Sequence, residues 1–115
     1  MGFLDLFKAP DYDSIEAKAI QSNRLVGTGT KEIQAALKKV KVGDIVTFKK
    51  SKRDGNTYYI VSAWNTGSRI GEISYGTSGW LAENYPGAQF TGRVTAKVKG
   101  DAYTPSTVDI EYKIH

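Results

Sequence analysis

Few side chains in this 115-residue sequence have the types and spacing that catalysis requires. The one histidine is His115 at the C-terminus, where chain ends tend to fray, and there is no cysteine. The carboxylate pairs Asp11/Asp13 and Asp109/Glu111 fit a helix start and the solvent-facing side of a strand better than an acid–base or metal site. The runs GTGT and YGTSG lack the frame of a phosphate loop. We therefore expect no enzymatic activity, no metal and no cofactor.

The basic residues of the sequence indicate binding to a polyanion more strongly than any residues indicate catalysis. Seven basic residues and one aspartate lie between positions 38 and 53, a local net charge of +6 in a chain whose net charge is +4. Such a cluster attracts phosphates through counterion release, and the rings of Tyr58, Tyr59 and Trp64 on the adjoining strand are suited to base stacking. A solvated lysine-rich surface, with the aromatic residues shared between core and surface, explains the same pattern without a ligand.

Composition places the chain among single-domain globular proteins, with 40% hydrophobic and 24% charged residues. At this length folding buries about two-thirds of the surface of the unfolded chain. The lack of cysteine fits a reducing compartment, and no apolar run is long enough to span a bilayer or form a signal peptide. We expect a cytoplasmic protein.

The N-terminal region, residues 1–23, is predicted to form an apolar segment followed by a short helix. Residues 1–7, MGFLDLF, have helical spacing and need a surface to dock on, either their own domain or a partner or membrane surface. Asp13 and Glu16 resemble a capping box that would open a helix through Gln21. Residues 24–115 form the predicted main domain.

The main domain is predicted to consist of strands and two short helices. After a first short strand at 24–27, the spacing of Ile33, Ala36, Leu37 and Val40 predicts a helix that lies on the sheet. Strands follow at 44–50, 57–64 and 69–74 as an antiparallel meander, with turns at 54–56 and 65–68. Gly71 inside the third of these indicates a bulge or a close backbone approach. Whether Tyr58 or Tyr59 faces outward stays open, because a one-residue slip exchanges them.

The C-terminal half is predicted to hold a short helix and two strands. Thr77 or Ser78 would cap the helix, with Trp80 and Leu81 as its anchors. Residues 89–99 and 107–114 alternate as half-buried strands. If these strands pair, the side chains of Lys97 and Lys99 are expected to face Asp109 and Glu111. The fold class is therefore mostly β: a small, six-stranded, antiparallel, partly closed barrel with two or three short helices.

The order of these motifs resembles the HIRAN domain, a small barrel found alone in bacterial proteins and attached to helicase-like DNA repair proteins. The matching stretches, spanning roughly positions 24–114, are LVG at 25–27, VGDIVTFKK at 42–50, the strand YYIVSAW, RIGEI at 69–73, Trp80 with Leu81, and FTGRVTAKV. The resemblance implies a stand-alone, non-enzymatic barrel that binds nucleic acid.

The family residues that grip a single-stranded DNA end are not matched. HIRAN domains that do so resemble one another in having aromatic or basic residues after the first VG, Tyr-Asp after an asparagine-rich turn, and basic residues after the IG strand. This chain has Thr28 and Gly29, then DGNT at 54–57, then Glu72. The candidate nucleic-acid-binding residues are therefore chosen by their charge and position, and not because they match the family's binding residues. They are Lys49, Lys50, Lys52, Arg53, Tyr58 and Tyr75.

Two functions follow as expectations. The first is weak binding of single-stranded DNA, or another nucleic acid, through a basic hairpin with nearby aromatic residues. The second is a protein–protein interaction module that recruits a protein partner through the apolar N-terminal segment or an exposed strand edge.

Overall fold

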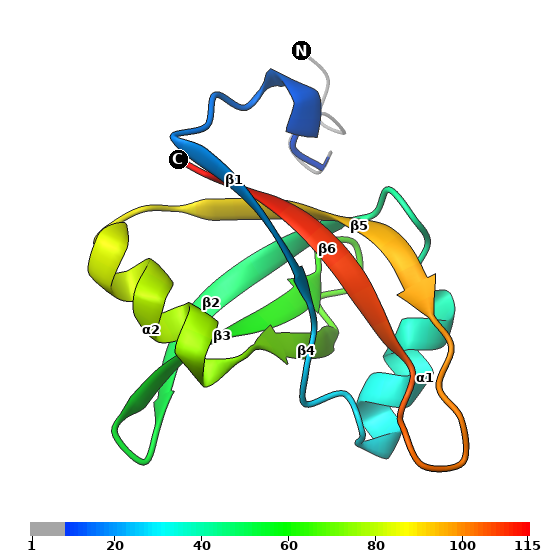
Figure 1. Cartoon of the computed structure of the whole chain (residues 1–115). Helices are drawn as coiled ribbons and strands as arrows, with labels where there is room; N and C mark the ends of the chain where they lie inside the picture. Colours follow the sequence, from blue (N-terminus) through cyan, green and yellow to red (C-terminus); the bar gives the residue numbers. More distant parts are fainter. Residues whose placement is uncertain (1–8) are drawn as a thin grey trace.

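One antiparallel sheet organises the described residues, 9–115, of the computed structural model (Figure 1). Its six strands have the order β1-β6-β5-β2-β3-β4, which bears out the predicted mostly-β fold. The elements in chain order are a 3₁₀ turn (Tyr12–Ser14), β1 (Ala19–Arg24), α1 (Lys31–Lys39), β2 (Ile45–Arg53), β3 (Asn56–Ala63), β4 (Arg69–Ile73), α2 (Tyr75–Asn84), β5 (Phe90–Val98) and β6 (Thr107–Ile114).

The sheet curls until its two edges nearly meet. Just after β1, the Val26 N–H donates to the Glu72 carbonyl at 2.9 Å, and the Glu72 N–H donates to the Val26 carbonyl at 3.0 Å. Among the described residues this is the one bridge outside the six strands, so backbone pairing joins the chain after β1 to β4 at a single residue pair. The barrel is therefore partly closed.

The core lies inside this curl because β5 and β6 alternate apolar and polar residues. Val94, Val108, Ile110, Tyr112 and Ile114 are almost completely buried. The helix α1 adds Ile33 and Leu37 to this core, as its spacing predicts, and α2 adds Leu81. Figure 1 shows α2 at the left and α1 at the lower right of the curled sheet. Burial of these side chains is the main source of stability, at roughly 1.5–3 kcal/mol for each large one.

The helix predicted from Asp13 to Gln21 is wrong. A 3₁₀ turn ends at Ser14, and residues 19–24 instead form β1, paired along its whole length with β6. Asp11, and not Asp13, stands at the start of the turn, without a side-chain capping bond. The strand is favoured over a helix because its backbone pairs with β6. In the strand, Asn23 also reaches the buried Tyr112, whose hydroxyl donates to Asn23 Oδ1 at 2.5 Å. The prediction for residues 1–7 lies outside the described residues.

Two smaller expectations also fail. Helix α2 starts at Tyr75 and buries Leu81, but Trp80 is 46% exposed and so does not anchor it. A register shift between Val94 and Ala96 places Lys97 opposite Val108. Asp109 and Glu111 are instead paired with arginines: Arg24 Nε lies 2.8 Å from Asp109 Oδ1, and Arg93 Nη2 lies 3.3 Å from Glu111 Oε1.

Gly71 is the predicted close approach. It sits beside a register shift in the β3–β4 ladder, and a Cβ added there would lie 2.8 Å from the Cβ of the buried Leu25. No flexible side-chain end can move aside at that point. The glycine is therefore required by the way the chain after β1 packs on β4.

We predict that Gly71→Ala lowers the free energy of unfolding by about 1–3 kcal/mol, because the new methyl group overpacks this contact. Urea denaturation followed by tryptophan fluorescence measures the change. Gly79→Ala is the control: it lies in α2 with no atom within 4 Å of an added Cβ, so stability should stay the same or rise by up to about 1 kcal/mol. Equal effects of the two substitutions would contradict the assignment.

Candidate nucleic-acid interface

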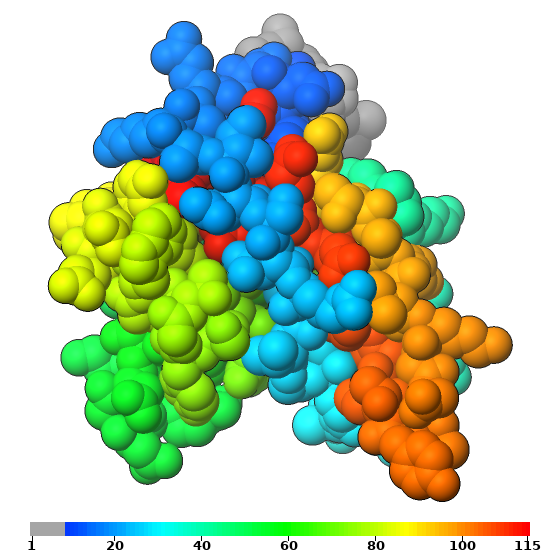
Figure 2. All heavy atoms as spheres, in the orientation of Figure 1, coloured from blue at the N-terminus to red at the C-terminus, as the bar shows by residue number. Residues whose placement is uncertain are grey.

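The hairpin of β2 and β3 carries most of the candidate residues. Its turn is Asp54–Gly55, with φ values of 52° and 81°. Two central residues with positive φ make the type I′ turn whose twist suits a two-residue hairpin. The space-filling view in Figure 2 shows this hairpin (green) projecting at one lower corner of the molecule, away from the loop between β5 and β6 (orange).

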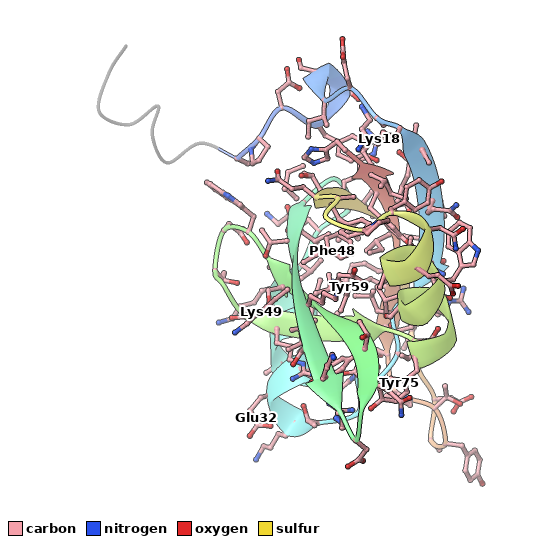
Figure 3. All side chains as sticks on the ribbon, turned by 90° about the vertical axis from the view of Figure 1, so that its left-hand side faces the viewer. Lys18, Glu32, Phe48, Lys49, Tyr59 and Tyr75 are labelled. Atoms are coloured by element: carbon pink, nitrogen blue, oxygen red, sulfur yellow. The ribbon has the colours of Figure 1, made fainter. Side chains whose placement is uncertain are left out.

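Three lysines of β2 lie exposed on the two faces of this hairpin. The register places Lys50 opposite Tyr59 and Lys52 opposite Thr57, whereas Lys49 is opposite Ile60 and points to the other face. Figure 3 shows Lys49 on the far side of the strands from Phe48 and Tyr59. Every ion pair within residues 9–115 has an arginine as its cation. The three lysines are thus available to a ligand.

Arg53, Tyr58 and Tyr75 are brought together, but they contact one another. Arg53 Nη1 donates to the Tyr75 hydroxyl at 3.0 Å, and Nη2 donates to the Tyr58 hydroxyl at 3.2 Å. The guanidinium lies 4.5 Å from the centre of the Tyr58 ring. Tyr58 is 6% exposed, whereas Tyr75 stays exposed with its ring edge-on to Tyr58. Arg53 and Tyr58 are therefore largely committed to this cluster.

The structure also shows whether Tyr58 or Tyr59 faces outward. Both are buried, Tyr59 beside Phe90 and Tyr58 under Arg53. A hydrogen bond from Ser51 and the adjacent Arg53 lower the pKa of the Tyr58 hydroxyl, while burial raises the pKa of Tyr59. Neither ring has an open face of the kind that stacking on a base requires.

Glu72 lies at the centre of the cluster, and the sequence analysis did not select it as a candidate site residue. It is 8% exposed, accepts a hydrogen bond from Arg53 Nη1 at 3.4 Å, and pairs with Arg69 through its second oxygen. Gly27 packs against it so closely that an added Cβ would lie 2.9 Å from Glu72 Cδ. The signal available in the sequence was a glutamate within the short strand RIGEI, three residues after the arginine that begins it.

A groove of about 810 Å³ runs beside Glu72, between α1 and the β3–β4 edge. Residues in or next to three stretches of the resemblance line it: Gly27 of the first VG, Arg53 just before the turn at 54–56, and Glu72 of the IG strand. Its charged lining carries one net positive charge. The charged residues that line it are Glu32, Lys39, Arg53, Arg69 and Glu72.

The remaining lysines of the basic cluster lie elsewhere. Lys38 of α1 lines a separate hollow of about 230 Å³ together with Lys97 and Lys99 of β5. Lys39 lines the groove beside Glu72. The local +6 charge is thus divided over several surfaces, and the projecting hairpin holds the largest share.

Within the described part of the chain, no group of three His, Cys, Asp or Glu side chains is arranged to hold a metal ion. Neither α-helix there is long and apolar enough to cross a bilayer. Comparison with family models, with curated proteins and with solved structures finds no match to this chain.

We predict that Glu72→Gln lowers the free energy of unfolding by about 1–2 kcal/mol. The substitution leaves two arginines without their shared carboxylate, and their partial exposure keeps the loss below that of a fully buried pair. Chemical denaturation tests this, with the exposed Glu83→Gln of α2 as the matched control. If the two variants unfold alike, Glu72 does not hold the cluster together.

Proposed function

We propose that this chain is a non-enzymatic, HIRAN-like module that binds single-stranded DNA weakly through the basic strand β2. The observation that carries the proposal is the set of three exposed lysines, Lys49, Lys50 and Lys52, which lie on a projecting hairpin and take part in none of the ion pairs within residues 9–115. Phosphate contacts by such lysines release counterions and need no base sequence.

The arrangement around Glu72 supports the family part of the proposal. One groove is lined by Gly27 of the first VG, by Arg53 just before the turn at 54–56 and by Glu72 of the IG strand, and Arg53 also donates to the Tyr75 hydroxyl. Glu72, however, offsets one of the two positive charges of Arg53 and Arg69. A DNA end placed there gains little attraction, so we expect the hairpin lysines to dominate and the 3′ end to matter little.

We predict that Lys49→Gln, Lys50→Gln and Lys52→Gln together weaken binding of a labelled single-stranded oligonucleotide. Fluorescence anisotropy at several salt concentrations should show the slope of log affinity against log salt falling by about 2, from about 0.7 per lost phosphate contact. An oligonucleotide with a blocked 3′ end should bind as well as one with a free end.

The control removes the same charge elsewhere: Lys38→Gln, Lys97→Gln and Lys99→Gln together, at the hollow between α1 and β5. This variant should keep most of the affinity. Equal losses in the two triple variants would show that net charge and not the hairpin drives binding. Full affinity after loss of the three hairpin lysines, or no binding by the wild type at low salt, would overturn the proposal.

The edge strand β1 favours a second candidate, a protein-interaction module. Because Leu25 N–H donates to the Val108 carbonyl and such pairs alternate, the backbone groups of Ile20, Ser22 and Arg24 point away from β6. Ile20 is also exposed. An extended partner segment can add to an edge of this kind.

Two variants test this candidate. Ile20→Lys charges the edge, and deletion of residues 1–8 removes the apolar N-terminal segment. Loss of a pull-down partner in either variant, with an unchanged circular dichroism spectrum, would support the module and identify the surface. Retention of every partner in both would exclude it.

A further inference from the structure

A groove lined by aromatic rings lies between β2 and the chain that follows α2. Its volume is about 420 Å³, within the range of small-ligand sites. Tyr59 forms part of its floor, and Phe48, Tyr85 and Phe90 are only partly buried and keep exposed surface. Figure 3 shows Phe48 and Tyr59 between the hairpin strands and α2.

We propose that this aromatic groove binds a base of single-stranded DNA while Lys50 and Lys52 contact the adjacent phosphates. The inference rests on the proposed function and names where a base is held. Aromatic rings give bases a stacking surface that tolerates any sequence, as weak and unspecific binding requires.

The rings that line this groove contact one another at tilted or edge-on angles. Phe48 and Phe90 are tilted by 44° at a centroid distance of 5.7 Å, and Tyr59 meets Phe90 edge-on at 5.0 Å. Tyr85 meets Trp80 edge-on at 5.8 Å. None of these pairs is a parallel stack, and Phe48, Tyr85 and Phe90 keep exposed surface, whereas Tyr59 is almost fully buried. Tyr58, by contrast, is covered by Arg53.

Charge makes a nucleotide a better occupant than an uncharged apolar ligand. Lys50 lines the groove, and no aspartate or glutamate does. Lys52 lies two residues further along the same face of β2, about 7 Å away along the strand. A ligand with a flat ring in the groove and negative charge along the strand satisfies both sets of side chains.

The test compares an oligothymidylate with an oligonucleotide of equal length that has abasic sites. For the wild-type protein we expect the oligothymidylate to bind at least tenfold more tightly, roughly the effect of one stacked base. Tyr85→Ala should bring this ratio towards one, and Tyr85→Phe should keep it. The control is Tyr103→Ala, at a tyrosine that is 97% exposed in the loop before β6.

Trp80 reports the location of the base. In a Trp64→Phe background it is the one tryptophan left of two, and it stands against Tyr85. Its fluorescence should change on addition of oligothymidylate and stay unchanged with the abasic oligonucleotide. This readout does not depend on the affinity difference.

The outcomes separate the two proposals. If both oligonucleotides bind equally and the hairpin lysines still matter, the proposed function stands and the base site is wrong. A preference for bases that survives Tyr85→Ala, with no change at Trp80, also overturns the aromatic groove. If neither oligonucleotide binds at low salt, the proposed function and the inference fall together.

Discussion

The contact between Val26 and Glu72 is the constraint on which the shape of this protein depends. Two backbone hydrogen bonds join the chain after β1 to the opposite edge of the sheet, and the Glu72 carboxylate is then held by Arg53 and Arg69. Gly27 fits there because a side chain would collide with Glu72. One residue thus closes the barrel with its backbone and ties the turn end of the hairpin to β4 with its side chain.

This arrangement decides which basic residues remain free. Arg53 is the residue of the basic cluster that reaches the closure, where it balances a buried carboxylate and covers Tyr58. The lysines before it make no ion pair within residues 9–115. Because side chains alternate along a strand, these lysines are divided between two faces. The same alternation that places Val46 in the core therefore puts Lys50 and Lys52 on the face of the aromatic groove and Lys49 on the other.

The candidate interface therefore differs from a simple basic patch. A charge cluster that is continuous in the sequence is spread over the hairpin, α1 and the groove beside Glu72. Rings that adjoin it in sequence are partly unavailable, while Tyr85 and Phe90, far along the chain, line the groove with Lys50. The result is a surface with modest charge and open rings on one face. Such a surface suits weak binding that does not depend on sequence.

Local pattern in the sequence determined the strands of the meander, the helix at Ile33–Val40, the last strand and the six-stranded, partly closed fold class. Each depends on a period of two or 3.6 residues or on a turn residue, which a short window of sequence contains. The strand character of β1, the shifted register at Val94, the pairing of Arg53 with Glu72 and the aromatic groove came only from the tertiary structure. Asn23 and Tyr112 are 89 residues apart, and Arg53 and Glu72 are 19 apart. Such contacts are selected by how the sheet curls, which no local pattern records.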